Sequence, residues 1–158
     1  MKIQAITLHQ PWASLVALRL KRYETRSWAP PAGVNYLAIH AGLHCDLDAL
    51  SGQAFRNAFG IPHHFTRAEL QEFVGGVIPL GGIVCIAKLG KAVATTGRMP
   101  DGCRRRDEYL FGDFSMGKFA WPLDVQIVCS PPIQCRGHQR IWSLPDDIHT
   151  VLVNHIQV

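Results

Sequence analysis

Three charged residues that could act together on one ligand lie near the start of the chain. Lys21, Glu24 and Arg26 place two cations and one carboxylate within a short segment. The cations could bind phosphate or a polar base edge. Glu24 could hold Lys21 in place, or it could accept a hydrogen bond from a base amino group, as carboxylates do with cytosine. A salt-bridged strand edge without a ligand would contain the same residues, so both interpretations stay open.

The flanking sequence predicts that these residues lie at a corner between a helix and a strand. Pro11 suits the first turn of a short helix of about two to three turns. One face of this helix is apolar: Trp12, Leu15 and Val16. After Lys21 the pattern has a period of two, so on an extended chain Glu24 and Arg26 share one face and Thr25 lies on the other. A strand with these charges is either a sheet edge or the wall of a cleft.

This stretch resembles the signature of the ASCH domain family, a group related to the PUA-like barrels. The family pattern is Gly-x-Lys-x-x-Glu-x-Arg, and residues 19–26 read Arg-Leu-Lys-Arg-Tyr-Glu-Thr-Arg. Lys21, Glu24 and Arg26 match. Arg19 replaces the glycine, which leaves the turn that ends the helix open and adds a cation near the cleft. Further segments resemble the family in the same order along nearly the whole chain: 8–15, 36–42, 114–123 and 136–142.

The resemblance implies a binding module for RNA or a nucleotide-like ligand, with a basic cleft beside the strand of Lys21, Glu24 and Arg26. It also implies an alternative, a hydrolase that acts on RNA or on a modified nucleoside. One branch of the family removes the acetyl group from acetylated cytidine, and ribonuclease activity has been proposed for others.

The match to the deacetylating branch is incomplete. That branch has a threonine at the place of Glu24 and uses it with the lysine and a distant glutamate. Thr25 is adjacent, but on a strand it points to the opposite face. Lys21 and Glu24 could still activate water as a pair if burial lowered the pKa of the lysine. An adaptor that binds a peptide in the cleft is a third alternative, and the sequence does not decide between an enzyme and a binding module.

The composition is that of one globular domain, residues 1–158. Hydrophobic residues make up 47% of the chain and charged residues 18%, which excludes a disordered chain. The formal net charge of +4 permits an anionic ligand without requiring one. We find neither a signal peptide nor an apolar run of about 20 residues, and the five cysteines contain no CxxC pair. We therefore expect a reduced, cytoplasmic protein without a membrane segment.

Short strands with helices inserted between them predict an α+β fold. Strands are expected over 2–8, 23–28, 36–42, 82–93, 119–128, 133–135 and 141–144, and helices over 46–59, 66–74 and from 145 onward. Residues 95–107 predict a loop, Gly75 and Gly76 predict turns, and Pro131 and Pro132 predict the end of a strand. The chain has no βαβ rhythm, and no glycine-rich phosphate loop that would predict a cofactor. This pattern favours a small, mixed, mostly antiparallel barrel, and the resemblance implies a PUA-like β-barrel with flanking helices.

Trp12, Trp28 and His40 are further candidates for the site. A base could stack on either tryptophan, and such stacking is worth roughly 1–3 kcal/mol. Core packing explains Trp12 better, because it lies on the apolar helix face, whereas Trp28 fits both roles. His40 ends a buried strand and could serve as a general acid or base, since imidazole titrates near neutral pH. A hydrogen-bonded structural histidine would fit His40 equally well.

A turn around residue 117 could form a second wall of the cleft. Backbone N–H groups at Ser115 and Gly117 could bind an anion, with Lys118 beside them. The family carries glycine followed by arginine or lysine at this place. A simple hairpin turn would use the glycine for its backbone freedom. The basic run 104–106 could contact phosphate or form a solvated loop tip.

A metal site is not expected. The candidate ligands match no compact spacing: His44, Cys45, His63 and His64. The sequence gives no indication of the oligomeric state.

Overall fold

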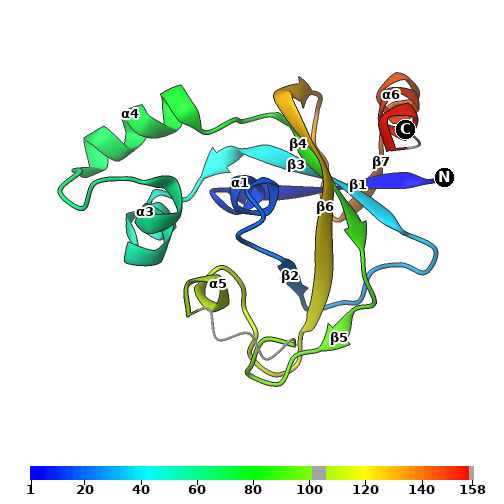
Figure 1. The fold of residues 1–158 in the computed structure, drawn as a ribbon, viewed down its shortest axis with the longest axis horizontal. Helices are drawn as coiled ribbons and strands as arrows, with labels where there is room; N and C mark the ends of the chain where they lie inside the picture. Colours follow the sequence, from blue (N-terminus) through cyan, green and yellow to red (C-terminus); the bar gives the residue numbers. More distant parts are fainter. Residues whose placement is uncertain (101–105, 157–158) are drawn as a thin grey trace.

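One sheet carries the fold in the computed structural model, which describes residues 1–100 and 106–156 (Figure 1). Its strands are β1 (Ile3–Gln10), β2 (Tyr23–Arg26), β3 (Tyr36–Cys45), β4 (Gly82–Leu89), β5 (Val93–Ala94), β6 (Phe119–Gln134) and β7 (Ile141–Ser143). The strand order is β2-β6-β4-β3-β1-β7, and β5 also pairs with β6. β1 and β3 run parallel, and the other pairs run antiparallel. The predicted α+β class and mostly antiparallel sheet are confirmed, but no pairing closes the sheet within the described residues.

The strand β6 joins two parts of the sheet because it is long enough to pair differently along its length. Its first residues pair with β2 and β5, and the residues that follow pair with β4. Glu24 of β2 lies opposite Trp121, and Arg26 lies opposite Phe119. The motif strand β2 is therefore at one end of the strand order, as its charges predict for an edge strand.

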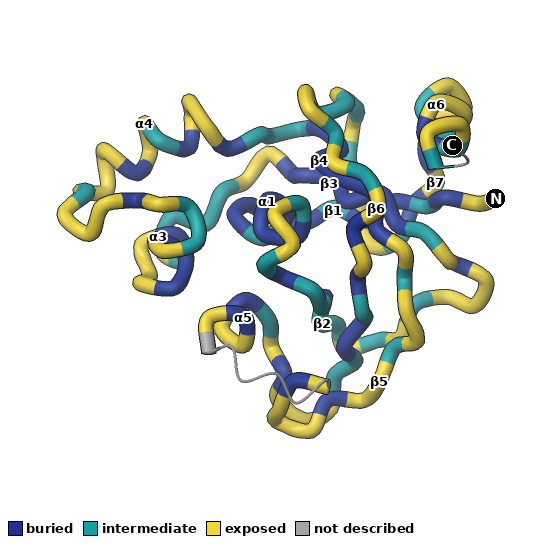
Figure 2. Tube along the Cα trace, in the orientation of Figure 1, coloured by how far each residue is buried: buried dark blue, intermediate teal, exposed yellow. Residues whose placement is uncertain are grey.

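The helices of the described residues are α1 (Trp12–Ala17), α2 (Leu47–Ser51), α3 (Gln53–Phe59), α4 (Arg67–Val77), α5 (Arg106–Leu110) and α6 (Asp146–Ile156). The helix α1 packs against the sheet, whereas α3 and α4 lie farther out (Figure 1). Val16 of α1 packs in the main core with Ile39 and Trp121, and Leu15 packs in a second core with Phe55 of α3. In Figure 2 the tube of α1 is largely buried, whereas α3 and α4 carry exposed outer faces. The helix α1 thus links the sheet to the outer helices.

Two helix predictions are wrong at glycines. The helix expected over 46–59 breaks at Gly52, whose extended backbone (φ −66°, ψ 147°) ends α2 and begins α3. Conversely, α4 continues through Gly75 and Gly76, where the sequence predicts turns, and ends at Val77. A glycine costs a helix about 1 kcal/mol relative to alanine. The predicted capping box at the start of α4 and the buried apolar face of the helix offset that cost.

The strand expected over 82–93 is interrupted. Gly90 follows the last residue of β4, and its N–H donates to the Pro122 carbonyl of β6 at 2.9 Å. A Cβ at Gly90 would lie 2.9 Å from the ring of the same proline. This close approach explains why the chain turns at a glycine here.

The strand β6 continues where Pro131 and Pro132 predict a break. Its ladder with β4 skips from Val128 to Ile133, so the prolines lie in an irregular bulge between two paired segments. A bulge needs no backbone N–H donors, which proline lacks. The strand expected over 133–135 is therefore the last part of β6.

The last helix, α6, lies where its apolar spacing predicts, and it contacts the start of the chain. The N–H of Ile3 donates to His149 Nε2 at 3.3 Å, so α6 lies beside the start of β1 (Figure 1). No helix in the described part of the chain is long and apolar enough to cross a membrane.

Candidate functional site

The corner between α1 and β2 ends the helix by a tight left-handed turn. Leu20 N–H donates to the Leu15 carbonyl at 3.0 Å, and Arg19 N–H donates to the Val16 carbonyl at 2.8 Å. These bonds form a Schellman motif, in which glycine is usual at the left-handed position. Arg19 has φ 60° there, and its side chain donates to the Val125 carbonyl at 3.1 Å. The helix is therefore shorter than predicted, and the Arg19 cation points to β6.

Lys21 is buried at this corner and has an acceptor for each of its three N–H groups. Its Nζ lies 2.6 Å from the carbonyl oxygen of Tyr23, 2.9 Å from that of Phe111 and 3.4 Å from Glu24 Oε2. The side chain is 3% exposed. Burial lowers the pKa of Lys21 below its ordinary value, and the carboxylate of Glu24 opposes that shift. Lys21 thus joins β2 to the segment that follows α5.

Glu24 lies between the two cations of the motif. Its Oε2 faces Lys21, and its Oε1 lies 2.8 Å from Arg26 Nε; the Glu24 side chain is 10% exposed and that of Arg26 32%. The N–H of Arg26 Nε is not aligned with the carboxylate, so this buried nitrogen forms an ion pair but no hydrogen bond. Two cations therefore balance the carboxylate, and one buried N–H donor of Arg26 is left for another acceptor.

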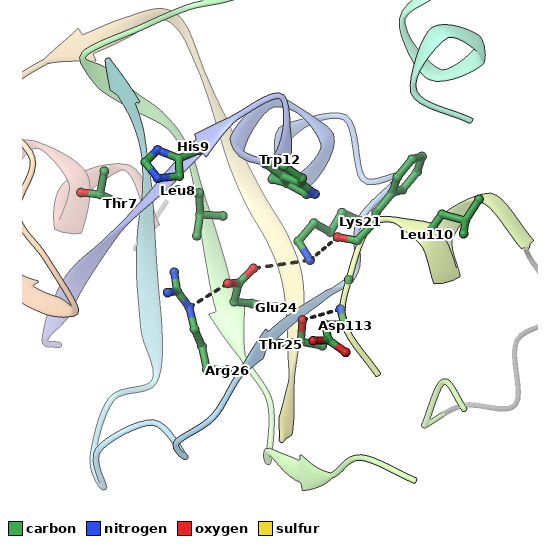
Figure 3. Close-up of a pocket in the computed structure, with 12 residues that line it drawn as sticks. Thr7, Leu8, His9, Trp12, Lys21, Glu24, Thr25, Arg26, Leu110 and Asp113 are labelled. Carbon is green, nitrogen blue, oxygen red and sulfur yellow. Dashed lines mark hydrogen bonds and ion pairs between the residues drawn. The ribbon is translucent and has the colours of Figure 1, made fainter. Parts of the chain in front are cut away.

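A cavity of about 440 Å³ lies over these side chains (Figure 3). We call it the first cavity, and its lining residues are Thr7, Leu8, His9, Trp12, Lys21, Glu24, Thr25, Arg26 and 110–113. β1 and α1 form one wall, and the segment after α5 forms the other. Lys21, Glu24 and Arg26 thus face one cavity, as the sequence predicts.

Thr25 has a structural bond in this cavity. Its Oγ1 accepts a hydrogen bond from Asp113 N–H at 2.8 Å, which fastens β2 to the opposite wall. Figure 3 shows this bond on the side of β2 away from Glu24. Thr25 therefore does not substitute for the missing threonine at position 24.

An ion pair that sequence reasoning missed holds the α5 wall. Glu108 is 4% exposed and accepts from Arg22 N–H at 3.0 Å, from Nε at 2.9 Å and from the terminal guanidinium nitrogen at 2.9 Å. Such charge-assisted bonds are strong and geometrically specific. They fix α5 against the corner and so position Phe111, whose carbonyl binds Lys21.

The two tryptophan candidates have different places. Trp12 lines the first cavity and also packs edge to face on Phe55, with ring centroids 5.9 Å apart. Trp28 lies outside that lining and packs edge to face on Trp121 at 4.8 Å. The guanidinium of Arg140 lies 4.7 Å from the centroid of the Trp28 ring, as in a cation–π contact. Trp12 is therefore the tryptophan that lines the first cavity, whereas the sequence favours core packing for this residue.

His40 lines a second cavity, of about 990 Å³, that adjoins the first. Thr7, His9 and Arg26 line both cavities. His40 is 2% exposed, and its Nε2 donates to the Cys135 carbonyl at 2.9 Å. The imidazole then has Nδ1 as an acceptor, and that buried atom has no hydrogen-bond partner. Burial lowers the pKa of His40, and its bonds to backbone carbonyls oppose the shift.

His40 is thus separated from the pair of Lys21 and Glu24 with which the sequence groups it as a catalytic candidate. It does not line the first cavity, and neither Lys21 nor Glu24 lines the second. The alternation of side chains along β1 and β3 cannot reveal this separation. The separation depends on how the segment before β7 folds over the sheet.

The turn of Ser115, Gly117 and Lys118 lines neither cavity. Gly117 has φ 88°, which suits a turn. Lys118 Nζ lies 3.1 Å from Asp113 Oδ2, and Ser115 N–H donates to Asp113 Oδ1 at 3.1 Å. The bonds from Ser115, followed by those from Lys118, lower the pKa of Asp113. Because Asp113 lines the first cavity, this turn braces the wall of the cavity.

Other lining residues were not singled out at the sequence level. His9 comes from the end of β1, Phe111 and Asp113 follow α5, and Arg136 and Arg140 precede β7. For the two arginines a signal exists, since they lie in the segment 136–142 that resembles the family. Nothing in the local pattern marks Phe111, which acts through its backbone carbonyl.

The described residues contain no group of three or more His, Cys, Asp or Glu side chains that could hold a metal ion. The cysteines among them are free: Cys45, Cys85, Cys129 and Cys135. Burial raises the pKa of Cys45 to about 11, so this thiol is not a thiolate at neutral pH. Of the basic run 104–106, residues 104 and 105 and the side chain of residue 106 lie outside the described part of the chain.

Comparison with known proteins identifies no family for this chain. No model of a known protein family matches the sequence, and no curated protein matches it. The resemblance to the ASCH domains therefore stays a prediction.

Proposed function

We propose that this protein binds RNA or a nucleotide-like ligand, with one base in the first cavity. The arrangement of Glu24 between Lys21 and Arg26 carries the proposal. A nearly buried carboxylate can accept a hydrogen bond from a base amino group, and the unpartnered Nε–H of Arg26 lies beside it as a donor. Cytosine and adenine both present an amino group next to a ring acceptor, which suits this pair.

The other walls of the first cavity support the same proposal. Trp12 offers an aromatic surface on which a base could stack with a gain of roughly 1–3 kcal/mol. Lys21 is tied to two carbonyl groups, so it holds Glu24 in one orientation before a ligand arrives. A preorganised site of this kind avoids the cost of ordering its side chains on binding.

We also propose that the sheet curls as an open form of the PUA-like barrel that the resemblance implies. β2 and β7 are at opposite ends of the strand order. Arg140, which precedes β7, nevertheless contacts the ring of Trp28, which follows β2. The two ends of the sheet therefore approach each other, and the second cavity lies beside this meeting point.

A hydrolase acting on RNA or a modified nucleoside is a second candidate, favoured by the lowered pKa of Lys21 beside Glu24. Neutral Lys21 would take a proton from a water molecule, whose oxygen would add to the amide carbonyl of acetylcytidine. The proton would then pass to the departing amine, giving acetate and cytidine. The acceptors around Lys21 disfavour this reaction, since each of its N–H groups is engaged.

The variant Glu24→Gln tests the proposal, because it raises the net charge by one. A protein that merely attracts phosphate should bind RNA more tightly after this change. If Glu24 accepts a hydrogen bond from a base, the affinity for RNA should instead fall by about tenfold in Glu24→Gln. We would measure binding of cytidine and short single-stranded RNA by tryptophan fluorescence at fixed salt, with Arg98→Ala as a control outside both cavities.

Mass spectrometry of the same mixtures, with acetylcytidine included, separates binding from hydrolysis. We expect binding without turnover, and RNA binding that weakens as salt rises. Turnover that is lost in Lys21→Ala would favour the hydrolase. RNA and nucleosides that fail to bind, or bind more tightly to Glu24→Gln, would refute the proposed base site.

A further inference from the structure

The second cavity has a basic wall, and two of its three arginines, Arg136 and Arg140, take no part in the proposed base contacts. Arginines line it at three positions: Arg26, Arg136 and Arg140. No aspartate or glutamate occurs among the described residues that line it. Within the described part of the chain no ion pair to a carboxylate joins Arg136 or Arg140. These charges therefore face an acid-free cavity, a condition that favours an anion.

Among the described residues, two buried polar atoms without a hydrogen-bond partner belong to residues that line the same cavity. They are Arg26 Nε and His40 Nδ1. Buried polar groups in folded proteins nearly always have a partner, so a pair of exceptions around one cavity calls for an explanation. The first is a cationic donor that pairs with Glu24 and takes part in the proposed base contact. The second is an acceptor when Nε2 carries the proton, and it lies against Gly137.

Gly137 keeps this wall close to the sheet. A Cβ at this position would lie 2.5 Å from His40 Cε1 and 2.8 Å from Thr7 Oγ1, so a larger residue would force the segment away. Arg136 directly precedes this contact. Arg140 follows it with φ 59° and rests over the Trp28 ring. The close packing of Gly137 thus holds both arginines at the cavity.

We infer that the second cavity is a phosphate subsite for a ligand whose base lies in the first cavity. Thr7, His9 and Arg26 line both cavities, so a nucleoside in one can extend its phosphate into the other. The ligand class is then a phosphorylated nucleoside, either a mononucleotide or a phosphodiester within RNA, and not a free nucleoside. The position of the base rests on the proposed function, whereas the anion site has its own evidence.

The test compares two double variants that each remove two positive charges. Arg136→Ala/Arg140→Gly removes two of the three arginines from the basic wall, and glycine tolerates the left-handed backbone at position 140. Lys91→Ala/Arg98→Ala is the matched control, because both residues are exposed and line neither cavity. We would titrate cytidine, cytidine 5′-monophosphate, pyrophosphate and a short single-stranded RNA into each protein by calorimetry at one salt concentration.

We expect the wild type and the control to bind the monophosphate at least about tenfold more tightly than cytidine, as charge-assisted phosphate contacts allow. In the variant that lacks Arg136 and Arg140, this ratio should fall to about one while cytidine binding persists. A ratio that stays unchanged, or that falls equally in the control, would overturn the inference. If circular dichroism shows that the double variant is unfolded, Arg136→Ala alone gives the same comparison.

The pyrophosphate and RNA arms separate the remaining outcomes. Cytidine binding without any gain from phosphate would overturn the phosphate subsite and leave the proposed base site standing. Pyrophosphate binding that depends on Arg136 and Arg140, without binding of any base, would support the anion site and refute the proposed base site. If the variant that lacks Arg136 and Arg140 loses affinity for RNA alone, the occupant is an internal phosphodiester. If it loses affinity for the monophosphate, the occupant is a terminal phosphate.

Discussion

Replacing Lys21 by methionine should destabilise the fold by about 3 kcal/mol. Methionine fills similar space but offers no N–H group to the carbonyls of Tyr23 and Phe111 or to the carboxylate of Glu24. A buried acceptor left without its donor costs about 1–3 kcal/mol. Arg26 still pairs with the carboxylate, and the cost of burying the lysine disappears. These two effects keep the loss at the low end of the range for a broken buried ion pair.

Urea unfolding followed by tryptophan fluorescence would measure this loss as a shift of the midpoint at constant m value. For a chain of this size, about 3 kcal/mol corresponds to a fall in Tm of roughly 6–12 °C. Lys91→Met is the matched control. This exposed lysine lies outside both cavities, and its replacement should change stability by less than about 0.5 kcal/mol.

A double-mutant cycle with Glu24→Gln would show whether Lys21 acts through the carboxylate. Once Lys21 is absent, removing the charge of Glu24 should cost less, so the double variant should be more stable than the sum of the single losses predicts by about 1 kcal/mol. Strictly additive losses, or a loss below about 1 kcal/mol for Lys21→Met, would refute the reasoning that this corner is organised by a buried ion pair.

Three further predictions concern the supports of the site. Arg19→Val should lower the free energy of unfolding by about 1–2 kcal/mol, because a β-branched side chain fits the left-handed backbone (φ 60°) less well than arginine and the bond to the Val125 carbonyl is lost, while Arg19→Gly should stay within about 1 kcal/mol of wild type; equal losses in urea unfolding would contradict this. Glu108→Gln should cost about 2 kcal/mol because the bonds from Arg22 lose their charge assistance, and an unchanged Tm would contradict it. Burial lowers the pKa of His40, so the unfolded chain binds the proton more readily and stability should fall as pH drops through about 6.5. His40→Gln should make this fall shallower between pH 7.5 and 5.5, and an unchanged slope of the urea midpoint would count against it.

Part of the charged motif could be predicted from the sequence because its geometry is local. Alternation along an extended strand places Glu24 and Arg26 on one face, whereas the place of Lys21 beside them is implied only by the family resemblance. The opposite wall could not be predicted in this way. Glu108 reaches Arg22 across 86 positions of sequence, and no periodicity marks the short helix α5 that carries this glutamate.

The failures at element boundaries have a common cause in tertiary contacts. Gly75 and Gly76 stay helical because the capped, half-buried helix outweighs their low propensity. Pro131 and Pro132 stay within β6 because the ladder bulges where they lack N–H groups. At Arg19 the sequence leaves the turn that ends the helix open; the structure has a left-handed turn there, with φ 60° and a side-chain bond to the Val125 carbonyl.

The central claim is that Glu24 and Arg26 bind a base in the first cavity. A crystal structure of the protein soaked with cytidine 5′-monophosphate tests it most directly. We predict the base amino group within about 3 Å of the Glu24 carboxylate, the ring against Trp12 and the phosphate beside Arg136 or Arg140. Density for the nucleotide away from Glu24, or a first cavity that the nucleotide does not enter at saturating concentration, would contradict the claim.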